Sequence, residues 1–366
     1  MFDQAGLDFT TIFARDADYF GDPGDFDANG RVVVVVTKEV NRVANPPLGF
    51  VSAGDKLLTG VCPASNEGEF FFLRSPDPAG QYTAGGYSQA DLERDFPNLL
   101  IHELVHIIQA TRRLAVGGEL MASYVAEGLA TAAQEIVGLE LLALAPGGNR
   151  GRSTVYTTFG ADQRAFFTFV GDLLAYFGFD FAGSRADGAP EQCSWSGSTD
   201  TGGAPGPCAF RHRLAYGVTW SLISQAIERH HGGAAGRKAI LRAFSEHTGP
   251  AGYPALEAVL GLPIATLVAE WAPMLYLDDR FPAATAFQQV DWDIRDVAAA
   301  WGTPNADLAA RQRGFADFAD AIQVRGGSVA FFEVSGANRG ATTIRVRRPD
   351  GTAAPSEVTI WAVRAQ

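Results

Sequence analysis

Two histidines and a glutamate stand together in one apolar stretch of the sequence, 99–108, which reads LLIHELVHII. His102 and His106 are four residues apart, so on a helix they project from the same face, with Cβ atoms about 5–6 Å apart. Two imidazoles at this spacing can bind one metal ion, and the HExxH pattern is typical of zinc. Glu103 then lies beside the ion without binding it. Its carboxylate can act as the general base that takes a proton from a water molecule attacking a carbonyl group.

A second interpretation is that His102 and His106 are solvated or hydrogen-bonded to neighbouring groups. Every other residue of the stretch except Glu103 is apolar, which predicts a helix buried almost all round. Two imidazoles and a carboxylate in such a place cost on the order of several kcal/mol unless they find partners. A metal ion is a partner for all three, and we therefore favour the metal site.

Catalytic zinc usually takes three protein ligands and leaves one position open, so a further ligand is required. No histidine follows at the HExxHxxGxxH spacing. The next predicted helix offers four glutamates instead: Glu119, Glu127, Glu135 and Glu140. We expect Glu127 to be the ligand, because the twenty residues between it and His106 allow a turn and one antiparallel helical stretch. Gly128 also lets neighbouring backbone approach closely. We expect the other three glutamates on a solvated helix face.

Attack of water on a carbonyl group also needs a donor to the oxyanion of the tetrahedral intermediate, a role that tyrosine or histidine can fill. His212 and Tyr216 are four residues apart in one predicted helix, and Tyr156 is a further candidate. We prefer the simpler interpretation, in which the tyrosine packs in the core and His212 caps a helix. The remaining histidines stand near predicted helix ends, where we expect them to be solvated: His230, His231 and His247.

Asp25, Asp27, Asn29 and Gly30 repeat the opening, DxDxNG, of a calcium-binding loop. The twelfth position is Val36, so the bidentate glutamate of an EF-hand is missing. A tight turn before a strand needs the same residue types. We favour the turn and keep a structural Ca²⁺ ion as the alternative.

Strand patterns fill the first ninety residues and helical patterns follow. Residues 31–37 form a β-branched run without alternation, which predicts a strand buried on both faces. Residues 69–74 predict a second strand, and if it lies at the sheet edge a peptide can add to it. Pro97 is expected in the first turn of the site helix, which runs to about residue 113 with Asp95 near its cap. Further helices are predicted at 119–144, 161–178, 212–231, 235–246 and 263–277.

The end of the chain returns to strand patterns, at 328–334, 342–347 and 358–363, after a Gly/Ser/Pro-rich stretch at 183–207 that predicts a long surface loop. We expect a catalytic domain over residues 1–320, with a sheet-rich part over about 1–90 and a mainly helical part over about 91–320. A small β-rich unit, 321–366, completes the chain.

Composition excludes some classes of partner. Apolar residues make up 47% of the 366 residues and the net charge is −12 without a local Lys/Arg cluster, so nucleic acid is a poor partner. No apolar run is long enough for a transmembrane helix.

Cysteines and the first residues bear on localisation. A disulfide between Cys193 and Cys208 would close a Gly/Ser/Pro-rich loop, and Cys62 is then left as a small buried residue. The first residues show no signal-peptide pattern. Either a signal peptide has been removed or the protein is cytoplasmic; we favour removal, which predicts a secreted or cell-surface protein.

Several motifs together resemble the gluzincin metallopeptidases, and particularly the hyicolysin family. They are the HELVH stretch, YVAEGLA at 124–130, DFDANGRV at 25–32 and SNEGEFFF at 65–72. The resemblance spans roughly residues 16 to 135. It implies a zinc endopeptidase with an α+β, zincin-type fold, a protein or peptide substrate, His102, His106 and Glu127 as zinc ligands, and Glu103 as the catalytic residue.

Two positions depart from the family pattern. Ala126 stands where asparagine is common, and Thr131 stands where a carboxylate could support a histidine ligand. These departures motivate an alternative, a surface or adhesion protein that kept the zincin fold, binds peptides and hydrolyses them weakly or not at all. A zinc hydrolase acting on a non-peptide amide is a third interpretation.

Overall fold

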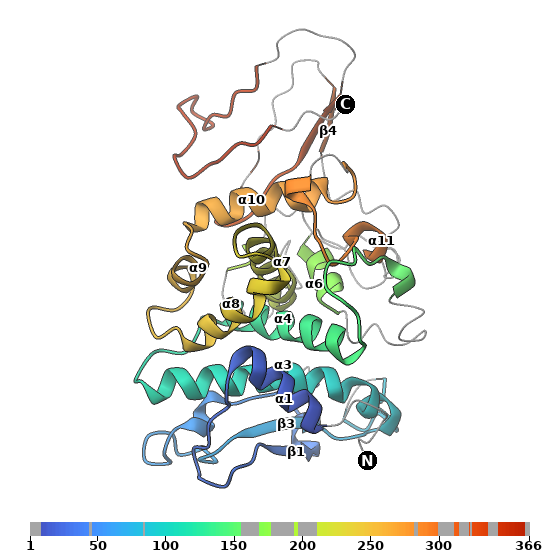
Figure 1. The fold of residues 1–366 in the computed structure, drawn as a ribbon, viewed down its shortest axis with the longest axis vertical. Coiled ribbons are helices and arrows are strands. Elements are labelled where there is room, and N and C mark those ends of the chain that lie inside the picture. Colours follow the sequence, from blue (N-terminus) through green and yellow to red (C-terminus); the bar gives the residue numbers. More distant parts are fainter. Residues whose placement is uncertain are drawn as a thin grey trace.

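The chain folds as an α+β protein in which a small mixed sheet lies at one end and helices are stacked above it (Figure 1). The computed structural model describes residues 9–43, 46–82, 85–154, 168–176, 194–196, 211–281, 285–298, 311–314, 322, 324–335 and 343–362. The strands are β1 (Val33–Thr37), β2 (Gly49–Phe50), β3 (Phe70–Arg74), β4 (Arg311–Gly314) and β5 (Phe332–Ser335). The longer helices are α1 (Phe9–Phe20), α3 (Gln89–Ala115), α4 (Ser123–Leu141), α6 (Thr168–Tyr176), α7 (Arg211–His230), α8 (Ala234–Glu246), α9 (Tyr253–Leu260) and α10 (Ile264–Leu277). Short helical turns are α2 (Lys38–Asn41), η1 (Ala53–Lys56), η4 (Thr285–Phe287) and α11 (Ile294–Ala298).

The N-terminal sheet has the order β1-β3-β2, with β1 parallel and β2 antiparallel to the central β3. Both predicted strands form, but β1 lies at an edge of the sheet and β3 lies in its centre. The prediction that the valine strand is buried on both faces is wrong, because β1 has β3 as its one neighbour in the described sheet and Val36 is 43% exposed. The strand at 69–74, expected as a possible edge, is central. A β-branched run indicates a strand, but it does not indicate how many neighbouring strands pair with it.

β3 turns alternate residues to opposite faces of the sheet. Phe71 and Leu73 are fully buried, and Phe71 stacks on Phe96 of α3 with ring centroids 6.4 Å apart. Phe70 and Phe72 lie on the other face and are half-buried. The sheet therefore packs its fully buried side chains against α3, the helix that carries the HExxH pattern.

Helix α3 begins earlier than the position of Pro97 suggested. The side chain of Ser88 accepts the backbone N–H of Asp91, and the Asp91 carboxylate accepts the backbone N–H of Ser88, which together form a capping box. Pro97 consequently lies inside the helix, and the prediction that it opens the helix with Asp95 near the cap is wrong. The helix ends at Ala115, two residues beyond its predicted end.

The helices predicted for α4, α7, α8 and α10 are confirmed to within four residues at each end. Of the helix predicted at 161–178, the structure describes α6. Of the loop predicted at 183–207, it describes 194–196, where Trp195 is buried. Two of the longer described helices were not predicted: α1, in a stretch interpreted as strand and turn, and α9.

The C-terminal part contains the parallel pair β4–β5, drawn at the opposite end of the molecule from the first sheet (Figure 1). β5 overlaps the strand predicted at 328–334. The described residues of the other two predicted strands, 343–347 and 358–362, are not in strands, so these predictions are wrong. Ile344 and Ile360 are 57% and 55% exposed, which shows that alternating apolar residues there do not pack on a core. β4 lies before residue 321, the predicted start of the C-terminal unit, and it pairs with β5, which lies after that residue.

None of the described helices is by itself long and apolar enough to cross a membrane. Helices α9 and α10 meet this criterion only when they are taken together, and the pair is bent by 83°.

Asp16 is a fully buried acid on α1, the helix that packs against α3 and α8. Neither of its carboxyl oxygens has a hydrogen-bond partner within the described part of the chain. Burial raises the pKa of Asp16 well above its ordinary value, so the folded protein keeps this carboxyl protonated at pH values where the unfolded chain ionises it.

We predict that Asp16→Asn becomes progressively more stable than wild type as the pH rises. In wild type, the contribution of Asp16 to the free energy of unfolding falls as the pH rises above about 4, by at most about 1.4 kcal/mol per pH unit, because the unfolded state releases a proton that the folded state retains. The amide has no such proton. Urea unfolding of both proteins at pH 4, 6 and 8 measures the difference.

Asp18→Asn is the matched control, because Asp18 lies on the same helix but is exposed and paired with Lys238 at the surface. The free energies of unfolding of Asp18→Asn and wild type should differ by no more than about 1 kcal/mol at each pH. A stability difference between Asp16→Asn and wild type that does not change with pH would show that Asp16 is not held protonated.

Candidate metal centre

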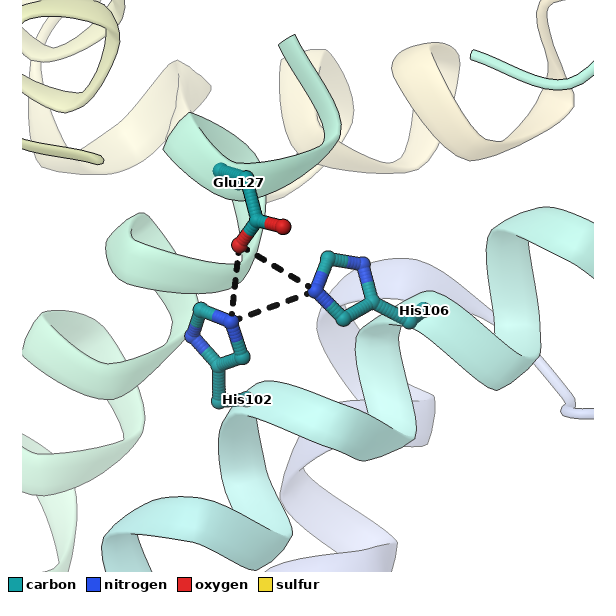
Figure 2. Close-up of side chains that lie close together, drawn as sticks. All are labelled: His102, His106 and Glu127. Atoms are coloured by element: carbon teal, nitrogen blue, oxygen red, sulfur yellow. Dashed lines mark hydrogen bonds and ion pairs between the residues drawn. The ribbon is translucent and has the colours of Figure 1, made fainter. Parts of the chain in front are cut away.

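Two imidazole nitrogens and one carboxylate oxygen converge between α3 and α4 (Figure 2). The Nε2 atom of His102 lies 3.0 Å from Oε2 of Glu127 and 3.2 Å from Nε2 of His106. The Nε2 atom of His106 lies 3.4 Å from the same carboxylate oxygen. The structure thus brings together the three ligands that were predicted from sequence.

These distances fit a zinc ion. Bonds of about 2.0–2.1 Å in tetrahedral geometry place any two ligand atoms about 3.3 Å apart. The three observed separations of 3.0, 3.2 and 3.4 Å bracket that value. The Nε2 atoms of the two histidines lie 3.2 Å apart. If both imidazoles are neutral, a hydrogen bond between these atoms needs one of them to carry a proton and the other to carry none. Two imidazoles and one carboxylate are also a ligand set found in catalytic zinc sites.

The three other glutamates considered as ligands lie away from the centre, each with its own partner. Glu119 accepts the backbone N–H of Ala251. Glu140 pairs with Arg15 and accepts the hydroxyl of Tyr19 on α1. The prediction of a solvated helix face is therefore wrong for Glu140, because α1, which was not predicted, covers that part of α4.

Glu135 is also buried rather than solvated, at 1% exposure. It accepts the indole N–H groups of Trp220 at 2.7 Å and Trp292 at 2.6 Å. Burial and the nearby Asp291 carboxylate raise the pKa of Glu135 to about 7 against the opposing charge of Arg237. Its role is to join α4 to its neighbours inside the helical stack.

Electrostatics couple the carboxylate and the imidazoles of the centre. Burial alone lowers the pKa of His106, but the Glu127 carboxylate outweighs burial and raises this pKa to about 9. Burial acts to raise the pKa of Glu127, and the two imidazoles overcome it and hold that pKa well below its ordinary value. His106 and Glu127 therefore form a half-buried imidazolium–carboxylate pair at neutral pH.

Glu103 is 5% exposed and follows His102 on the same helix. Burial raises its pKa, while the two imidazoles and a hydrogen bond from the backbone N–H of Val51 act in the opposite direction. Val51 directly follows β2, so the edge of the sheet holds the predicted general base in place. Nothing in the residue type of Val51 could have indicated this contact, since a backbone N–H makes it.

The two departures from the family pattern have specific contacts. Thr131 donates its hydroxyl to the backbone carbonyl of Glu127 at 2.7 Å and therefore does not support a histidine ligand. The Nδ1 atom of His102 is buried and, among the described residues, has no hydrogen-bond partner. The usual second hydrogen bond of a metal-binding histidine is thus not seen at His102.

Tyr216 lies at this centre. Its ring stacks on the imidazole of His102, with centroids 5.4 Å apart and planes inclined by 9°. Its hydroxyl hydrogen-bonds the Glu127 carboxylate. The preferred prediction was a tyrosine packed in the core; the ring is packed, and the residue against which it packs is the predicted ligand His102. The side chains of His212 and Tyr156, the other two candidates for the oxyanion donor, lie outside the described residues.

The DxDxNG segment forms a turn with its own hydrogen bonds. Asp27 accepts the backbone N–H of Asn29, and Asp25 accepts that of Gly30. Carboxylate oxygens of Asp25, Asp27 and Glu69 come within 4.8 Å of one another. The buried ammonium of Lys56, 3.2 Å from Glu69, already places a positive charge there. Calcium binding stays a prediction.

The other histidines and the cysteines lie away from the metal centre or outside the described residues. His230 pairs with Glu270, and His231 and His247 contact backbone carbonyls, so none of the three is only solvated. Cys62 is a free, half-buried thiol. Cys193 and Cys208 lie outside the described residues.

Comparison of the chain with protein-family models, curated proteins and solved structures finds no match.

We predict that zinc binding releases about one proton at pH 7. Only neutral imidazole binds a metal, so the ion must displace the proton that the pKa of about 9 keeps on His106. The apparent association constant should rise about tenfold per pH unit below pH 9. Calorimetry in buffers of different ionisation enthalpy measures the proton release, and competition with a chelating dye measures the affinity.

Glu127→Ala is the comparison variant. It removes both a ligand and the charge that raises the pKa of His106, so zinc affinity should fall and its rise with pH should level off near the ordinary histidine pKa of about 6.5. Wild-type affinity that does not change between pH 6.5 and 8.5, or unchanged zinc content after Glu127→Ala, contradicts this ligand set.

Proposed function

We propose that the protein is a zinc-dependent endopeptidase of the gluzincin type. The observation that carries the proposal is that one carboxylate oxygen and two imidazole nitrogens lie within 3.4 Å of one another. The buried side chain of Glu103 directly follows His102 on α3. The resemblance stated above adds the motifs at 25–32 and 65–72 to those of the site, although no family model matches the chain.

His102, His106 and Glu127 would hold the zinc ion, which when bound would supply Lewis acidity toward water and the substrate carbonyl. Glu103 takes a proton from the attacking water and delivers it to the leaving amine nitrogen. Burial raises the pKa of Glu103, which brings the carboxyl closer to the neutral range where a base both accepts and returns a proton. The Val51 N–H fixes its orientation.

The peptide-binding edge is assigned to β2 rather than to β3. β3 has a partner on each side and offers no free edge, whereas β2 is paired with β3 alone in the described sheet. β2 also leads directly to Val51 and so to Glu103. An extended substrate that adds to this edge would pass the general base.

The alternative of a peptide-binding protein without turnover was motivated by Ala126 and Thr131. Thr131 uses its hydroxyl within its own helix, so it leaves the histidines without a supporting carboxylate at that position. An assay of zinc content together with hydrolysis separates this alternative, and the non-peptide amide hydrolase, from the endopeptidase.

We predict that Glu103→Gln binds zinc stoichiometrically and hydrolyses peptides at least about 100-fold more slowly than wild type, since loss of a general base costs about 10²–10⁴-fold. A quenched peptide library and casein, each with and without chelator, measure the activity. Chelator should abolish the wild-type activity, and added zinc should restore it.

Glu93→Gln, ten residues earlier on α3, is the matched control and should retain wild-type activity. Stoichiometric zinc without hydrolysis of any peptide by wild type would favour the binding protein. More than about a tenth of wild-type activity in Glu103→Gln would show that Glu103 is not the base.

A further inference from the structure

Two ligands of the proposed zinc centre contact the same side chain, that of Tyr216 on α7. Its ring face lies on the imidazole of His102, and its hydroxyl reaches the carboxylate of Glu127. Figure 2 shows one oxygen of that carboxylate turned to the two imidazoles and the other turned away. A carboxylate ligand rotates freely about its last bond unless a second contact holds it.

Close helix packing brings Tyr216 to this position. A Cβ atom at Gly128, the residue after Glu127, would come within 2.4 Å of the Thr219 side chain and 3.1 Å of its backbone. A Cβ atom at Gly217 would lie 2.1 Å from the backbone of Leu173 on α6. The glycines therefore let α7 approach both α4 and α6 more closely than any other residue would allow. Tyr216 lies one turn before Thr219 and thus beside Glu127.

The orientation of His102 depends on this contact. Metal-binding histidines usually donate the N–H of their second ring nitrogen to an acceptor that fixes the plane of the ring. Nδ1 of His102 is buried, and the described part of the chain offers it no such acceptor. The nearly parallel ring of Tyr216 is then the contact that restrains the imidazole plane.

We propose that Tyr216 is the positioning residue of the metal centre: its ring restrains His102 and its hydroxyl holds the Glu127 carboxylate, so that both ligands face the ion. This inference rests on the proposed zinc site and adds to it a role for α7. The hydroxyl is occupied by Glu127, which distinguishes this role from donation to the oxyanion of a reaction intermediate.

The test compares the zinc affinities of Tyr216→Phe and Tyr216→Leu, measured by competition with a chelating dye. Tyr216→Phe removes the hydroxyl but keeps a stacking ring, and we expect zinc affinity to fall about 10–100-fold, the usual effect of losing an outer-shell partner. Tyr216→Leu removes both contacts and should weaken affinity further. The visible absorption of the Co²⁺-substituted protein should change in both variants, because the ligand geometry changes.

A double-mutant comparison isolates the contact with Glu127. In a Glu127→Ala background the hydroxyl has lost its acceptor, so Tyr216→Phe should cause no further loss of zinc affinity. In that background Tyr216→Leu should still weaken binding, because the stack on His102 is lost. An equal effect of Tyr216→Phe with and without Glu127 would overturn the proposed hydrogen-bond role.

Tyr19→Phe is the matched control for folding. Tyr19 also donates its hydroxyl to a glutamate of α4, Glu140, but lies away from the metal centre. It should lower stability about as much as Tyr216→Phe does while leaving zinc affinity unchanged. A Tyr216→Phe variant that keeps wild-type zinc affinity and loses only turnover would overturn the proposal and assign the hydroxyl to the oxyanion.

These outcomes are separate from those of the proposed function. Zinc bound without peptide hydrolysis would end the endopeptidase proposal and leave the positioning role intact if the affinities change as expected. Wild-type protein that binds no zinc would end both.

Discussion

The structure depends on one partly buried electrostatic arrangement, the carboxylate of Glu127 held between the imidazoles of His102 and His106. Burial acts against the charge of this carboxylate, and the two imidazoles outweigh the effect of burial. The three side-chain atoms lie within 3.4 Å of one another. The packing of α3 and α4 thus keeps together polar groups that would otherwise separate into water.

Contacts on α4 outside the centre keep Glu127 in register. Two turns further along α4, Glu135 accepts the indole N–H groups of Trp220 on α7 and Trp292. A slip of α4 along its axis would leave a buried carboxyl and two indoles unpaired, at a cost of about 1–3 kcal/mol for each unsatisfied group. Gly128 sets the distance to α7 and Glu135 sets the register, so Glu127 is placed by buried contacts that lie outside the centre.

How far the sequence could predict this centre depends on how local each contact is. His102 and His106 share one helical turn, and their convergence follows from helix geometry alone. Glu127 could be selected because one turn and one helical stretch leave few ways back to His106. Tyr216 could be named but not placed, because its position depends on the close approach of α4, α6 and α7. Val51 could not be found at all, since its contact is made by a backbone N–H.

The same distinction explains the errors in the fold. The Ser88–Asp91 capping box is a local signal, and it starts α3 ahead of Pro97. The order of strands is not local: the valine run at 31–37 predicts a strand equally well at an edge or in the centre. That order has a chemical consequence, because the strand next to the site is the short β2 rather than β3. The backbone N–H of Val51, the residue after β2, hydrogen-bonds the Glu103 carboxylate, so the end of this strand contacts the predicted general base.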